Sequence, residues 1–173
     1  RARIAEYIQW WPLVHVDFHE MSPESSYFFF PPEEPINENV SEITLAWSKT
    51  IGLANAHAFD RFGWSYYTGE SFDLFYPAYG DSWPTLQGAV GMTYEQAGGA
   101  RGGVRYLRRD GTELTLAARL HHHHVAGMAT LLASVKEKTR LQTDFHRFRQ
   151  EAIEVGRSGD VVEFLFPPQS GGR

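Results

Sequence analysis

His19 is the first residue whose type and setting suit chemistry. It lies in the run Val16-Asp17-Phe18-His19-Glu20, directly after an apolar stretch. A neutral imidazole is a common zinc ligand, and a ligating histidine needs a hydrogen-bond partner for its second nitrogen. A strand-end histidine that only bonds a neighbour explains the same pattern, and the spacing by itself favours that simpler role.

Glu95 is the second such residue, at the end of the run Gly91-Met92-Thr93-Tyr94-Glu95. A carboxylate that ends an apolar strand lies in a medium of reduced dielectric, which raises its pKa. Such a group suits a general base acting on a metal-bound water. The alternative is a glutamate that caps a loop or pairs with Arg101 or Arg105.

Other histidines are weaker metal candidates. His15 and His19 are four residues apart, which on a strand separates them by about 13 Å, too far to share one ion. On a helix His121 and His124 share a face, but no third ligand accompanies them. We expect the run His121–His124 to consist of packed and solvated histidines.

An aromatic and glycine-rich segment covers residues 72–84. A tyrosine hydroxyl on such a loop, from Tyr76 or Tyr79, can donate to a substrate carboxylate or carbonyl. The alternative is a small aromatic core beneath the loop. The wider region 62–88 has no clean periodicity, but its many aromatics argue against disorder, so we predict an ordered segment that forms part of a site.

The elements that must position these residues follow from hydrophobic periodicity. Short strands are predicted at 12–18 and 89–94, an apolar run at 26–30 and a surface loop at 31–39. Helices are predicted over 1–10, 41–61 (capped by Asn39 or Ser41) and 115–155, the last broken near 136–140. On the last helix, apolar stripes comprise Leu120, His124, Met128, Leu131 and Val135, then Leu141, Phe145 and Phe148. Alternating strands and helices predict an α/β domain, with His19 and Glu95 at one edge of the sheet.

The composition excludes several classes of function. The chain has 173 residues, a net charge of −5 and no cysteine. An acidic chain is a poor partner for nucleic acid or an anionic membrane, because phosphate binding needs clustered Lys and Arg. No apolar run is long enough to span a membrane. Disulfides and thiolate zinc sites are excluded.

Taken in order, these segments resemble the zinc carboxypeptidase family of metallopeptidases. Four runs carry the resemblance: Asp17–Met21, Ser26–Pro32, Tyr79–Pro84 and Gly91–Gln96. Their order and spacing are more specific than any one of them, and the resemblance covers roughly residues 1–150.

The resemblance implies a role for each candidate residue. His19 resembles the family's third zinc ligand, and Glu95 its general base. Tyr76 or Tyr79 corresponds to the mobile tyrosine, Trp83 to a tryptophan before the base, and Asp81 to a position near the pocket for the last side chain, where an acid favours Lys or Arg. The implied fold is a mixed sheet with helices on both faces. The implied cofactor is Zn²⁺ and the implied substrate is a peptide.

The departures from the family are equally informative. The first two zinc ligands of the family come from an earlier His-x-x-Glu motif, which none of the 173 residues forms. The family's substrate-binding arginines lie in that earlier half too. The resemblance therefore makes residues 1–155 the C-terminal half of a catalytic domain that lacks its N-terminal half, with 156–173 an exit segment. Because catalytic zinc takes three protein ligands, we expect this chain alone to bind zinc weakly and to have negligible peptidase activity.

Two alternatives stay open. The same fold could carry a non-catalytic domain that binds peptide or glycan, or an amidase or deacylase. A secreted or periplasmic location follows from the resemblance alone.

Overall fold

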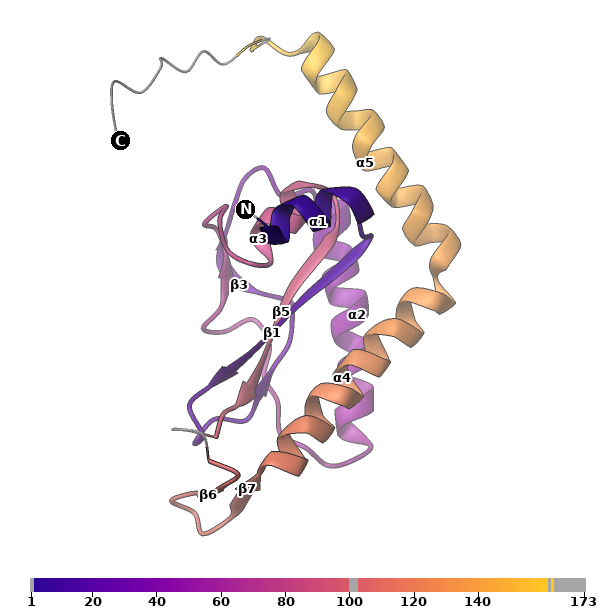
Figure 1. The fold of residues 1–173 in the computed structure, drawn as a ribbon. Coiled ribbons are helices and arrows are strands. Elements are labelled where there is room, and N and C mark those ends of the chain that lie inside the picture. The colour runs from indigo at the N-terminus through magenta and orange to yellow at the C-terminus, as the bar shows by residue number, and fades with distance from the viewer. Residues whose placement is uncertain (1, 100–102, 162, 164–173) are drawn as a thin grey trace, which may run out of the picture.

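The computed structural model describes residues 2–99, 103–161 and 163. A small sheet lies between helices, and a long C-terminal helix extends beyond the body (Figure 1). The helices are α1 (Ala2–Trp10), α2 (Glu42–Asp60), α3 (Ser82–Leu86), α4 (Leu116–Lys136) and α5 (Lys138–Ser158). The strands are β1 (Val14–Met21), β2 (Tyr27–Phe28), β3 (Glu33–Ile36), β4 (Asp73–Leu74), β5 (Val90–Ala97), β6 (Arg105–Leu107) and β7 (Glu113–Thr115).

The main sheet has three strands in the order β1-β5-β2. β1 and β5 are parallel and pair without a break from Val14 opposite Val90 to Met21 opposite Ala97. β2 joins the other side of β5 in the antiparallel direction. Both long strands extend past their predicted ends at residues 18 and 94, because the backbone ladder continues through polar pairs such as Glu20 and Gln96.

The two faces of β5 pack against different helices. The side chain of Tyr94 points towards α2 and α4, where its hydroxyl hydrogen-bonds Asn55 Nδ2 at 2.7 Å and Thr130 Oγ1 at 2.6 Å. On the opposite face, Thr93 donates to Asp81 Oδ2 at 2.8 Å, next to α3. Successive side chains of β5 thus pack on opposite faces of the sheet, as in a strand that is buried on both sides. The predicted mixed sheet flanked by helices is therefore confirmed.

An aromatic core fixes the sheet to α2. The described side chains of Tyr27, Phe28, Phe29 and Phe30 are each at most 1% exposed, and the core continues into α2 through Trp47, Ile51 and Phe59. Removing one such aromatic ring costs about 3–5 kcal/mol. The apolar run predicted at 26–30 is thus the centre of the core, although only its Tyr27–Phe28 part pairs as a strand.

The helix predictions are confirmed in extent but not in orientation. Ser41 caps α2 by accepting a hydrogen bond from Thr44 N, and the long C-terminal helix breaks at Glu137. The predicted apolar stripe of α4, however, does not face the described core. Leu120, Leu131 and Val135 are 60–67% exposed, whereas the buried positions of α4 are Arg119, Ala126, Ala129 and Thr130. Small residues let α4 approach α2 closely, so the larger apolar side chains point outward.

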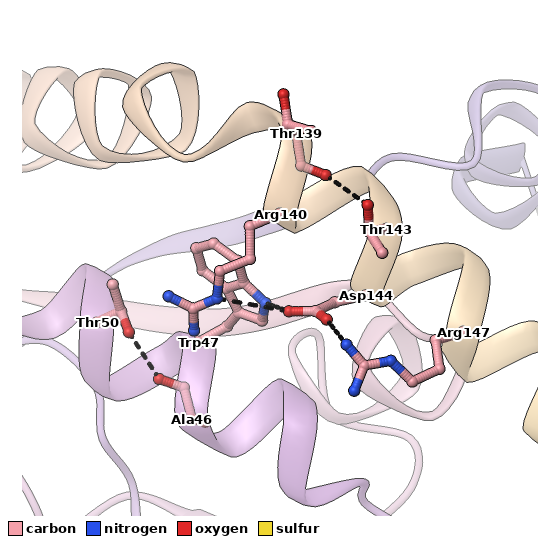
Figure 2. A network of polar contacts seen from close by, with 8 residues as sticks. All are labelled: Ala46, Trp47, Thr50, Thr139, Arg140, Thr143, Asp144 and Arg147. Atoms are coloured by element: carbon pink, nitrogen blue, oxygen red, sulfur yellow. Dashed lines mark hydrogen bonds and ion pairs between the residues drawn. The ribbon is translucent and has the colours of Figure 1, made fainter.

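A polar cluster attaches α5 to α2 (Figure 2). The indole of Trp47 donates to Asp144 Oδ2 at 2.9 Å, and Asp144 is only 7% exposed. Arg147 and Arg140 form ion pairs with the same carboxylate, and the guanidinium of Arg140 lies 4.3 Å from the centre of the Trp47 ring. The predicted second stripe contributes here, since Leu141 is buried against this junction.

One loop prediction needs correction. The expected loop at 31–39 contains β3, which pairs in parallel with β4 from the segment that showed no periodicity. A partner so distant in sequence leaves no local signal. The predicted domain end at residue 155 falls inside α5, and most of 156–173 lies outside the described residues. No helix of the described chain is long and apolar enough to cross a membrane.

Candidate active site

His19 and Glu95 lie directly opposite each other on neighbouring parallel strands. The prediction that they share one part of the sheet is thus confirmed, with a difference in detail. Each is the third residue from the end of its strand, so its side chain projects from the sheet face rather than from the rim. Because strand side chains alternate, Asp17 and Thr93 form the next pair on the same face.

These side chains open into a cavity of about 250 Å³. Its walls come from β1, β5 and the aromatic segment 62–88 that follows α2, the segment predicted to be ordered and to form part of a site. The lining residues are Asp17, His19, Ser71, Phe72, Asp73, Tyr79, Gly80, Asp81, Thr93 and Glu95. With four carboxylic acids and one histidine, the cavity favours a cation or a positively charged ligand group.

Glu95 has the environment expected of a general base. It is 8% exposed, and its Oε2 atom has no hydrogen-bond partner among the described residues. Burial raises the pKa of its carboxyl group above the ordinary value, the nearby His19 opposes that rise and Asp17 adds to it. Arg105 does not neutralise it, because Arg105 pairs with Glu113. The alternative partner Arg101 lies outside the described residues.

Asp81 is buried beside the cavity, at 3% exposure. Burial raises the pKa of its carboxyl group, while hydrogen bonds from Thr93 and Ser82 act in the opposite direction. Both carboxylate oxygens therefore already have protein donors, at 2.8 Å and 3.3 Å respectively.

The structure divides the predicted substrate residues into two groups. Tyr79 and Asp81 line the cavity with His19 and Glu95. Tyr76 does not line it; its ring is exposed and contacts that of Tyr79, with 5.4 Å between the ring centres. Trp83 lies on α3 and lines a second, mainly apolar cavity of about 200 Å³, which shares only Tyr79 and Gly80 with the first.

Among the histidines of the described residues, His19 alone lines this cavity. His15 lines the second cavity and contacts the ring of Tyr7. His122 Nδ1 hydrogen-bonds Gln96 Oε1 at 2.9 Å, and His123 Nδ1 hydrogen-bonds the hydroxyl of Tyr27 at 2.8 Å. Burial lowers the pKa of His122 to about 4.

Asp17 is a site residue that the sequence prediction did not single out. Its Oδ2 atom lies 3.0 Å from His19 Nε2. The two-residue spacing was the available signal, because residues i and i+2 of a strand point to the same face. Thr93 was also missed, although it lies two residues before Glu95 on β5 and so shares its face. Asp73 was missed because its approach to His19 and Glu95 depends on the fold of the 62–88 segment.

The described residues do not complete a zinc site. Nowhere in residues 2–99, 103–161 and 163 do three His, Cys, Asp or Glu side chains converge in a way that could hold a metal ion. His19 is a suitable ligand by type and by its carboxylate partner, but catalytic zinc takes three protein ligands.

Comparison with known proteins gives no relative for this chain. No protein-family model matches it, and neither the curated proteins nor the solved structures contain a significant match. Its function must be inferred from the site itself.

Proposed function

We propose that this chain carries the general base, Glu95, and one metal ligand, His19, of a zinc-dependent carboxypeptidase that removes C-terminal residues from peptides. The observation that carries the proposal is the direct pairing of these two residues on parallel strands, over a cavity that also contains Tyr79 and Asp81. The other zinc ligands would have to come from outside the described residues, in the N-terminal half of the domain that the family resemblance implies.

The chemistry assigned to Glu95 is a proton transfer. Its buried Oε2 atom has no hydrogen-bond partner among the described residues, so it can accept a proton from a water molecule in the cavity. The water oxygen adds to the scissile carbonyl carbon. The proton then passes from Glu95 to the leaving nitrogen as the C–N bond breaks. A carboxyl group whose pKa is raised by burial suits both steps.

The cavity supports a role for two further residues. Of the two candidate loop tyrosines, Tyr79 is the one beside His19 and Glu95, so its hydroxyl is the better candidate donor to a substrate carboxylate or carbonyl. Asp81 and Asp73 make the cavity acidic, which favours a Lys or Arg side chain on the substrate.

The test uses the complete open reading frame that encodes this chain, purified with and without Zn²⁺. We expect release of a C-terminal residue from N-blocked dipeptides, faster for Lys or Arg than for Phe. Glu95→Gln should reduce kcat by about 10²–10⁴-fold without a comparable change in KM. An exposed glutamate, Glu38, provides the control variant Glu38→Gln.

Two results would overturn the proposal. A reading frame without a His-x-x-Glu motif before His19 would support a binding domain of the same fold instead. Hydrolysis of N-acyl amides that lack a terminal carboxylate, with no cleavage of peptides, would indicate an amidase or deacylase.

A further inference from the structure

We propose that Asp17 is a positioning residue whose carboxylate holds the imidazole of His19 in one orientation and one tautomer. The inference rests on the proposed function only in treating His19 as a ligand. The geometry of the pair stands on its own: Asp17 Oδ2 lies 3.0 Å from His19 Nε2.

The backbone of β1 brings the two side chains together. Asp17 and His19 are two residues apart on a strand that pairs continuously with β5, so both must point into the same cavity. Asp17 is the more sheltered partner, with 22% of its side chain exposed against 52% for His19. A sheltered carboxylate therefore holds a ring that would otherwise rotate freely.

Gly80 makes room for this carboxylate. A Cβ atom at position 80 would overlap Asp17 Oδ2, the same oxygen that faces His19. Any larger residue there would displace the carboxylate or push the loop away. Space, rather than an unusual backbone conformation, is thus the reason for glycine at this position.

The backbone of His19 is held by the ladder between β1 and β5, where His19 pairs with Glu95 and its neighbours pair on either side. On the opposite face the ring of Phe18 contacts those of Tyr94 and His123, with 5.5 Å and 5.0 Å between the ring centres. With the backbone fixed in this way, the torsions of the His19 side chain are the remaining freedom, and Asp17 restricts them.

A chemical consequence follows for the imidazole. A carboxylate oxygen can only accept, so Asp17 Oδ2 at 3.0 Å favours the neutral tautomer in which Nε2 carries the proton and Nδ1 keeps its lone pair. A carboxylate behind a ligating histidine fixes the ring and increases the basicity of the free nitrogen. In Asp17→Asn the amide can donate or accept, so neither tautomer is enforced.

The first experiment observes His19 without any metal. The full chain is labelled with ¹⁵N, treated with EDTA and kept at pH 8, and the ring nitrogens are assigned from long-range ¹H–¹⁵N spectra. We expect a single Nε2–H tautomer with an Nε2 proton shifted downfield by the carboxylate. Asp17→Asn and Gly80→Ala should each remove that downfield proton signal, because they disturb the contact from its two sides.

The control is Asp73→Asn, which changes a carboxylate of the same cavity that accepts a hydrogen bond from Phe75 N instead of facing His19. The His19 spectrum of this variant should match that of the unchanged chain. An unaltered His19 spectrum in both Asp17→Asn and Gly80→Ala would overturn the inference. If one variant fails to fold, the other decides.

The second experiment measures Zn²⁺ affinity in the protein from the complete reading frame. Asp17→Asn should weaken it by about 10–100-fold. If that protein binds no zinc while the NMR result holds, the proposed function fails and the positioning role survives. If it hydrolyses peptides but Asp17→Asn leaves both the spectrum and the affinity unchanged, the positioning role fails.

Discussion

Replacing Glu95 with glutamine should make the protein more stable. Glu95 is 8% exposed and one of its oxygens has no hydrogen-bond partner among the described residues. Leaving a buried polar group unpaired costs about 1–3 kcal/mol, and more when the group is charged. Glutamine keeps the shape and removes the charge. We therefore expect Glu95→Gln to raise the free energy of unfolding by about 1–2 kcal/mol at pH 8, or Tm by about 2–8 °C.

The pH dependence of this gain follows from the direction of the pKa shift. Burial raises the folded-state pKa of Glu95 above the unfolded value, so the folded protein keeps this proton to higher pH than the unfolded chain does. The destabilisation by the buried Glu95 charge is absent below the unfolded-state pKa. It grows as the pH rises above that value and is complete above the folded-state pKa. The difference between Glu95→Gln and the unchanged chain should thus be largest at pH 8 and close to zero at pH 4.

Urea unfolding at both pH values measures this difference directly, with Glu38→Gln as the exposed control that should change stability by less than about 0.5 kcal/mol. A loss of stability in Glu95→Gln at pH 8, or a gain that persists unchanged at pH 4, would refute the reasoning. Glu95 would then be a satisfied structural carboxylate, and the general-base role would lose its physical support. A residue that costs stability yet would be needed for activity is typical of functional sites.

Three further predictions concern the scaffold. Asp144→Ala should lower the free energy of unfolding by about 2–3 kcal/mol, because it leaves the buried indole N–H of Trp47 unpaired. Asp144→Asn keeps an acceptor for that N–H and should cost less than about 1 kcal/mol. Equal losses of stability in the two variants would contradict this. Burial lowers the pKa of His122 to about 4 in the folded protein, so on acidification the imidazole is protonated in the unfolded chain before it is protonated in the folded one. The free energy of unfolding should therefore fall as pH drops from about 6.5 towards 4. Partial exposure reduces the effect to about 1–2 kcal/mol, and urea unfolding of His122→Asn should show a correspondingly smaller slope with pH. Leu131 on the exposed stripe of α4 is 60% exposed and Leu141 on α5 is 5% exposed. Leu131→Ala should therefore lower the free energy of unfolding by less than about 0.5 kcal/mol, and Leu141→Ala by about 2–5 kcal/mol. Similar thermal shifts for both variants would show that α4 is oriented differently.

Local patterns predict the elements of this fold well, and their faces less well. The helical spacing of Trp47 and Ile51 and the cap at Ser41 define α2, because these are short-range properties of the chain. The stripe of α4 misleads for a physical reason. Periodicity identifies an apolar face, but close helix packing can select the face with small residues such as Ala126, and the large side chains then face outward.

The site shows the same division. His19 and Glu95 could be identified because they follow apolar runs, and strands of one sheet bring such positions together. The placement of Trp83 could not be identified in this way. The segment after Tyr79 turns into α3, which directs Trp83 into the second cavity, and no spacing in the sequence encodes that turn. The contact between Asp17 and Gly80 depends on the same loop.

The ladder between β1 and β5 has a consequence for how this sequence can vary. The distance between His19 and Glu95 is set by hydrogen-bond register and not by the long stretch of chain between them. Residues could be inserted into or deleted from the surface loops within that stretch without moving the pair. A single insertion between Val14 and His19, by contrast, would turn His19 to the face occupied by Phe18 and Tyr94. Natural variants that keep this site should therefore differ in loop length but never in the number of residues from Val14 to His19 or from Val90 to Glu95.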